Sequence, residues 1–199
     1  RVSLREAFAH SSNIGIARLI TKNYKKNPEL FVNRLYNFGL GDKSKIDLIG
    51  APKPDIKFPS DQSWSGVSLP WMSYGYELRL TPLDILTFYN TVANNGYLVY
   101  PYLGDAFRRG SELISIPKDR ISHTICSQST IEKTQALLMG VVNRGTASKL
   151  SDLPFSISGK TGTAVKNYTN SSSNEAKSYQ SSFVGFFPSE NPKYSCIVL

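Results

Sequence analysis

The sequence has 199 residues, of which 40% are hydrophobic and 19% charged, and its formal net charge is +8. This composition is that of a folded domain, and it excludes low-complexity, collagen-like and highly charged disordered chains. No apolar run reaches the ~20 residues that span a bilayer, and the basic residues are scattered rather than arranged in a nucleic-acid-binding motif.

The first residues predict two helices with a junction between them. Ser3 and Glu6 are spaced as a capping box and begin a short helix that runs to about His10. Apolar residues then recur at helical spacing from Ile14 onward. The triplet Ser11-Ser12-Asn13 therefore falls where one helix ends and the next begins.

Proline and glycine mark the next two helices. Asn27-Pro28 is a cap followed by a proline in the first turn, and Gly39 ends this helix. Residues 42–70 carry several prolines and turn formers and predict a long irregular connection. Thr81-Pro82 begins another helix in the same way, and Asn95-Gly96 ends it.

The second half changes from helical to strand periodicity. Residues 97–125 predict short strands and turns, and a capping box from Ser129 to Glu132 begins a helix that Gly145 ends. Strands are then predicted in the segments 155–164, 182–187 and 194–199, with a mobile hairpin loop at 166–178. The order indicates an α/β fold in which a helical half precedes an antiparallel sheet.

One strand carries a motif that fits acyl-transfer chemistry. Lys160-Thr161-Gly162 lies in the context Ile-Ser-Gly-Lys-Thr-Gly-Thr-Ala-Val. Lys160 supplies a positive charge, the hydroxyls of Thr161 and Thr163 suit a carboxylate, and the Thr163 N–H suits an oxyanion. We expect Gly159 and Gly162 to let a substrate peptide approach the strand edge.

A Ser-x-Asn element is the second part of such a site, and the sequence holds three copies of it. They begin at Ser11, Ser172 and Ser189. We favour Ser11 with Asn13 because this copy lies at a helix junction, and we expect the other two to be exposed in polar turns far from the strand. Plain helix capping is the alternative for the first copy.

The nucleophile is the missing part. The sequence contains Ser-x-x-Lys only as Ser115-Ile116-Pro117-Lys118. Proline inside this turn opposes the helix that must present the serine and the lysine together. We therefore interpret this match as chance.

Cysteine and histidine offer no metal site. Cys126 and Cys196 lie far apart without a CxxC spacing, and His10 and His123 form no cluster with them. We expect the two cysteines to be buried free thiols, with a disulfide between them as the alternative.

The ordered motifs together resemble class B penicillin-binding proteins. The motifs that carry the resemblance are Ser11-Ser12-Asn13-Ile14-Gly15, Met72-Ser73-Tyr74-Gly75-Tyr76-Glu77, Leu80-Thr81-Pro82-Leu83, Asn94-Asn95-Gly96, Arg144-Gly145-Thr146-Ala147 and Gly159-Lys160-Thr161-Gly162-Thr163-Ala164. They span nearly the whole chain, and the Met-Ser-Tyr-Gly-Tyr stretch is more similar to the septal type than to the elongation type.

The resemblance implies the transpeptidase fold shared with serine β-lactamases, an antiparallel sheet flanked by helices. It implies a septal peptidoglycan D,D-transpeptidase that needs no cofactor, acts on D-Ala-D-Ala stem peptides through a serine ester, and is acylated by β-lactams. Residues 1–199 would be a partial domain, with the serine helix and first strands upstream and the sheet cut at its C-terminal end. The fragment would then be inactive by itself.

The resemblance also implies roles and surroundings. Ser11, Asn13 and Lys160 would be catalytic, Thr161, Gly162 and Thr163 would bind substrate, and Tyr76, with Tyr74, would form an aromatic wall of the cleft or simply pack beside Trp71. An N-terminal anchor would hold the protein in the cytoplasmic membrane, with divisome and glycosyltransferase partners. A β-lactam sensor, a serine β-lactamase and a catalytically dead scaffold are the alternatives.

Overall fold

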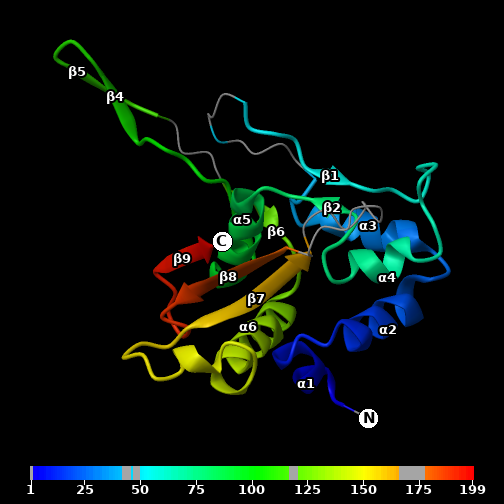
Figure 1. The fold of residues 1–199 in the computed structure, drawn as a ribbon. Coiled ribbons are helices and arrows are strands. Elements are labelled where there is room, and N and C mark those ends of the chain that lie inside the picture. The colour runs from blue at the N-terminus through cyan, green and yellow to red at the C-terminus, as the bar shows by residue number, and fades with distance from the viewer. Residues whose placement is uncertain (1, 42–45, 47–49, 117–120, 166–177) are drawn as a thin grey trace.

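A computed structural model describes residues 2–41, 46, 50–116, 121–165 and 178–199 (Figure 1). Its helices are α1 (Leu4–Ala9), α2 (Asn13–Tyr24), α3 (Pro28–Asn37), α4 (Ser68–Met72), α5 (Pro82–Ala93) and α6 (Gln128–Arg144), with a 3-10 turn at Ser148–Leu150. Its strands are β1 (Asp55–Ile56), β2 (Leu78–Arg79), β3 (Tyr97–Val99), β4 (Ala106–Arg109), β5 (Glu112–Ser115), β6 (Ile121–Thr124), β7 (Ser158–Val165), β8 (Tyr179–Phe187) and β9 (Tyr194–Val198).

The main sheet consists of β7, β8 and β9 in antiparallel order. Side chains alternate between its two faces. On one face, Phe186 is fully buried against Val92 of α5 and Leu138 of α6. On the other, Phe183 and Phe187 pack against the cluster around Val141, Val142 and Ile157. This α/β arrangement is the one predicted, and it leaves β7 as an edge strand.

The helical half is organised around short, well-capped helices. Ser3 caps α1 by accepting a hydrogen bond from the Glu6 N–H at 3.2 Å. Thr81 and Asp84 form the reciprocal capping box of α5, in which each side chain accepts from the other's backbone N–H. Helix α1 packs against α6, and α6 packs against β7. Helix α1 and the edge strand β7 are therefore held by the same helix.

A two-stranded hairpin projects from the rest of the molecule. Strands β4 and β5 pair only with each other in the described chain and extend away from the main sheet (Figure 1). Ser115 is the last residue of β5 and is exposed. A strand cannot place a serine and a lysine on one helical turn, which agrees with our interpretation of this Ser-x-x-Lys match. Pro117 and Lys118 lie outside the described residues.

Several boundaries differ from those predicted. The N-cap of α6 is Ser127, so the helix begins before the predicted capping box at Ser129. Asn27 is the N-cap of α3, but its side chain makes no capping hydrogen bond. Helix α4 was not predicted, because it is a single turn that contains Pro70. The predicted hairpin loop at 166–178 lies outside the described residues, except for its last one.

The expectation of buried thiols was wrong. Both cysteines are free, but Cys126 is only half-buried and Cys196 is exposed on β9. Position 196 belongs to the face of β9 that carries Tyr194 and Val198, and both of these side chains are exposed as well. The alternation of the strand therefore explains the exposure of Cys196.

Candidate active site

The junction between α1 and α2 holds Ser11 in an unusual backbone conformation. Ser11 has a φ of +55°, in the left-handed region. Its N–H donates to the Phe8 carbonyl at 3.1 Å, and the Ser12 N–H donates to the Ala7 carbonyl at 2.7 Å. These two bonds form a Schellman motif, whose left-handed position usually carries glycine. A serine here costs about 1 kcal/mol in backbone strain.

The three residues of the triplet divide two tasks between them. Ser12 is the N-cap of α2, because its hydroxyl accepts a hydrogen bond from the Gly15 N–H at 3.2 Å. Ser11 and Asn13 instead line a cleft that faces the sheet. Helix capping therefore accounts for Ser12 alone, and the plain capping interpretation does not explain the serine at position 11.

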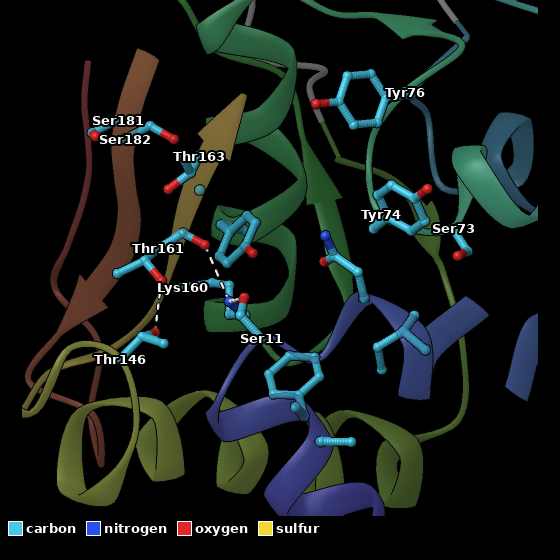
Figure 2. A pocket seen from close by; sticks show the side chains of 16 residues that line it. Ser11, Ser73, Tyr74, Tyr76, Thr146, Lys160, Thr161, Thr163, Ser181 and Ser182 are labelled. Atoms are coloured by element: carbon cyan, nitrogen blue, oxygen red, sulfur yellow. Dashed lines mark hydrogen bonds between the residues drawn. The ribbon is translucent and has the colours of Figure 1, made fainter. Parts of the chain in front are cut away.

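Lys160 joins this junction to the sheet. Its ammonium donates a hydrogen bond to the Ser11 hydroxyl across 149 positions of sequence (Figure 2). It also donates to the Thr161 carbonyl at 3.1 Å. Burial lowers the pKa of Lys160 below the ordinary lysine value. The Ser-x-Asn junction and the Lys-Thr-Gly strand therefore meet at the hydrogen bond between Ser11 and Lys160.

The outer edge of β7 presents backbone groups to the cleft. Alternate residues of an edge strand direct their N–H and C=O groups outward. The Thr161 carbonyl accepts from Lys160, and the Val165 N–H donates to the Tyr76 hydroxyl at 3.4 Å. Thr163 lies between Thr161 and Val165, so its N–H and C=O also point outward from the edge of β7, into the cleft. Within the described chain, those two groups have no protein partner.

The cleft is lined by one cation and many hydroxyl groups. Its volume is about 770 Å³, and the residues that line it are Ala7, Phe8, Ser11, Asn13, Ile16, Ser73, Tyr74, Tyr76, Tyr89, Thr146, Lys160, Thr161, Gly162, Thr163, Ser181 and Ser182 (Figure 2). None of these described lining residues is acidic. The site therefore suits an anionic ligand that can accept several hydrogen bonds.

Tyrosines form the wall opposite β7. The rings of Tyr74 and Tyr76 meet edge to face, with centroids 5.8 Å apart, and Trp71 lies 6.0 Å from Tyr76. Burial, and secondarily Tyr76, raises the pKa of Tyr74. Both tyrosines are half-buried and line the cleft, so packing beside Trp71 and lining the cleft occur together.

Two glycines of β7 have different surroundings. A side chain at Gly162 would meet the Ser182 hydroxyl in the cleft. A side chain at Gly159 would instead meet the Phe183 ring and the backbone of β8 at Val184 and Gly185. Gly159 is therefore required by packing inside the sheet, whereas Gly162 borders the cleft.

The other copies of Ser-x-Asn do not reach the cleft in the part of the chain that is described. Ser189 accepts a hydrogen bond from the Ser158 hydroxyl at 2.9 Å, and its N–H donates to the Ser156 hydroxyl at 2.9 Å. We had expected Ser189 to be exposed and far from β7, but it is half-buried beside the first residue of that strand. The copy at Ser172 lies outside the described residues.

Thr146 and Tyr89 are among the lining residues that were not predicted. Thr146 follows α6, and its hydroxyl lies 2.6 Å from the Thr161 hydroxyl. Tyr89 was predicted only as part of the buried face of α5, but it also lines the cleft, and burial raises the pKa of its hydroxyl. The Arg-Gly-Thr-Ala stretch gave a reason to consider Thr146, whereas a tyrosine at helical spacing is more often a core residue.

The described residues give no indication of a metal site or a membrane span. They contain no group of three His, Cys, Asp or Glu side chains that could hold a metal ion. No helix among them is both long and apolar enough to cross a membrane.

A Ser-x-Asn junction that faces a Lys-Thr-Gly strand edge is characteristic of serine acyl-transfer domains that react with penicillin. The comparison with protein families agrees with this class. The family model described as "Penicillin binding protein transpeptidase domain" matches residues 1–199. The chain therefore belongs to the penicillin-binding protein transpeptidase family.

Curated relatives and solved structures are similar to nearly all of the chain. It is 28% identical over 194 residues to penicillin-binding protein PbpB of Mycolicibacterium smegmatis, covering 94% of this chain and 29% of that protein. It is 24% identical to a peptidoglycan D,D-transpeptidase FtsI homolog of Mesostigma viride, and the match covers 97% of this chain and 34% of that protein. The crystal structure of penicillin-binding protein 3 of Mycobacterium tuberculosis with aztreonam superposes with a TM-score of 0.81 and 27% identity. The superposition covers 97% of this chain and 44% of that chain. The chain thus spans about a third of the curated relatives.

Proposed function

We propose that this chain is part of a septal peptidoglycan D,D-transpeptidase. The contact between Lys160 and Ser11 carries the proposal, because it brings the Ser-x-Asn and Lys-Thr-Gly elements into one cleft across 149 positions. Relatives named peptidoglycan D,D-transpeptidase FtsI, including that of Buchnera aphidicola subsp. Baizongia pistaciae at 29% identity, support it. The aztreonam complex of a similar protein supports β-lactams as ligands.

The reaction would proceed through a serine ester. A serine oxygen attacks the carbonyl between the two D-alanines, and the Thr163 N–H stabilises the resulting oxyanion. The peptide C–N bond then breaks, and the terminal D-alanine leaves as an amine after gaining a proton through Ser11. An acceptor amine of a second strand attacks the ester, forms the new amide and returns the serine. The proton that the serine gives up on attack goes to the departing amine, and the proton that the acceptor amine gives up returns to the serine, so neither step needs a cofactor.

The remaining residues would bind the donor peptide. Asn13 holds the substrate amide and the catalytic lysine of Ser-x-x-Lys. The charge of Lys160 and the hydroxyls of Thr161 and Thr163 attract the terminal carboxylate in a site whose described lining has no acidic residue. Gly162 leaves room at the strand edge, and Tyr76 covers the opposite side.

The nucleophile is proposed to lie upstream of Arg1, in a Ser-x-x-Lys helix that completes this partial domain. An N-terminal anchor would place the protein in the cytoplasmic membrane with the catalytic domain outside, near divisome and glycosyltransferase partners. A β-lactam sensor, a serine β-lactamase and a catalytically dead scaffold are the other candidates. The names of the relatives favour the transpeptidase.

Labelling with a fluorescent penicillin tests the proposal. We expect the full-length protein to gain one covalent label that peptide mapping places on a serine upstream of Arg1. We expect the isolated 199-residue chain to remain unlabelled, because Ser11 and Lys160 can position a peptide without forming an ester. Rapid hydrolysis of the label would indicate a β-lactamase, and labelling of Ser115 or another serine of this chain would contradict the proposal.

A further inference from the structure

The turn that follows α6 touches both halves of the cleft. The Thr146 N–H donates to the carbonyl of Ala9, the last residue of α1, at 3.1 Å. The Thr146 hydroxyl lies 2.6 Å from the hydroxyl of Thr161, the residue after Lys160. One residue thus connects a helix that ends two positions before Ser11 with the strand that carries the lysine (Figure 2).

Gly145 sets how closely these elements approach. A Cβ atom added to Gly145 would lie 2.2 Å from the Ala9 carbonyl oxygen. Its φ of −112° is open to any residue, so lack of space, and not backbone conformation, requires the glycine. The end of α6 is therefore held directly against the end of α1, and the position of the Thr146 hydroxyl is fixed by backbone contacts.

Of the two hydroxyl hydrogens of Thr146 and Thr161, only one is needed for the hydrogen bond between them. Each hydroxyl donates one hydrogen bond and can accept two. At 2.6 Å, one hydrogen lies between the two oxygens, and the other is available to the cleft. If Thr146 is the donor, the hydroxyl of Thr161 must direct its own hydrogen elsewhere. A chain of hydroxyl donors that ends on an anion is strengthened along its length.

We propose that Thr146 is a positioning residue that donates its hydroxyl proton to Thr161 and so directs the Thr161 O–H toward the carboxylate of the acyl donor. This inference rests on the proposed function and adds to it a residue that selects for the carboxylate. Stability does not require the pair, because Thr146 is exposed and water can replace its partner.

Acylation of the full-length protein by benzylpenicillin and by its methyl ester tests this role. Thr146→Val removes the hydroxyl but keeps the shape of the side chain and the backbone bond to Ala9. We expect it to slow acylation by the acid roughly three- to tenfold, to leave the ester nearly unaffected, and to change the melting temperature little. Thr146→Ser should restore the rate with the acid.

A double-mutant cycle separates positioning from direct effects. In a Thr161→Val background, Thr146→Val should have no further effect on the acid, because Thr146 acts through Thr161. Equal losses on acid and ester, no loss on either, or additive effects of the two valines would overturn the inference. Thr146→Ala replaces the valine variant if the latter folds poorly. If the wild-type protein is acylated by neither compound, it is the proposed function that fails.

Discussion

The two described copies of Ser-x-Asn show how little the tripeptide itself determines. Ser11 sits in a left-handed helix junction and contacts Lys160 from across the cleft. Ser189 sits in the turn after β8, where it binds Ser158 and Ser156 at the start of β7. Both copies are adjacent to strand β7. Ser11 contacts Lys160 in the part of the strand that lines the cleft, whereas Ser189 contacts Ser158 at the buried start of the strand. The surrounding backbone, and not the spacing of the motif, decides which serine lines the cleft.

Exchanging each serine for alanine should give opposite results in the two copies. Ser11→Ala should slow penicillin acylation of the full-length protein by about 10²–10⁴, the usual contribution of a proton-transfer group. Ser189→Ala should leave the rate unchanged but destabilise the fold by about 1–2 kcal/mol, because the Ser158 hydroxyl, 1% exposed, loses its partner. Stopped-flow acylation and urea unfolding measure the two effects. Slower acylation in Ser189→Ala would contradict the prediction that only the Ser11 copy takes part in the reaction.

Removing the charge of Lys160 should have the next largest effect. Lys160→Ala should slow acylation by about 10²–10³ while the fold remains intact, because an electrostatic contact at the reacting centre is lost. Lys193→Ala is the matched control, since Lys193 is exposed near the second copy and does not line the cleft. A change of less than a few-fold in Lys160→Ala would exclude this lysine from the site.

Glycine at position 11 should separate strain from chemistry. Ser11→Gly and Ser11→Ala both remove the hydroxyl, so both should lose acylation. Glycine adopts the φ of +55° without strain, so the glycine variant should be more stable than the alanine variant by about 1 kcal/mol. Urea unfolding of the two variants measures the difference. Equal stability would mean that the junction relaxes and that no strain is stored there.

The smallest expected effect is a shift in pH dependence. Burial lowers the pKa of Lys160, so this lysine loses its proton at a lower pH than an ordinary lysine. Because the charged form attracts the carboxylate, acylation should decline on the alkaline side beginning below the ordinary lysine pKa. Lys160→Arg should move the decline to higher pH, since a guanidinium stays protonated. Initial rates corrected for hydrolysis of the penicillin would show whether the two profiles differ.

The sequence predicted local features well and tertiary contacts poorly. The capping residues of α1 and α5, the end of α6 at Gly145 and the strands of the main sheet follow from local chemistry. Ser11 and Lys160 were placed together through the resemblance to a family. The bond between Thr146 and Thr161 and the packing of Gly159 against Phe183 depend on which elements meet in space. No periodicity in the sequence carries that information.

The outer edge of β7 also bears on how the protein behaves in concentrated solution. An unpaired strand edge invites other chains to pair with it, and proteins usually protect such edges with charged residues, prolines or bulges. Under the proposed function a substrate reaches this edge, so the edge would have to stay partly uncovered. At one end of this edge, the Lys160 ammonium donates to the Thr161 carbonyl. At the other end, the Val165 N–H donates to the Tyr76 hydroxyl. In the described part of the chain, only the N–H and C=O of Thr163 remain open between them, so the stretch of this edge that another chain could pair with is one residue long.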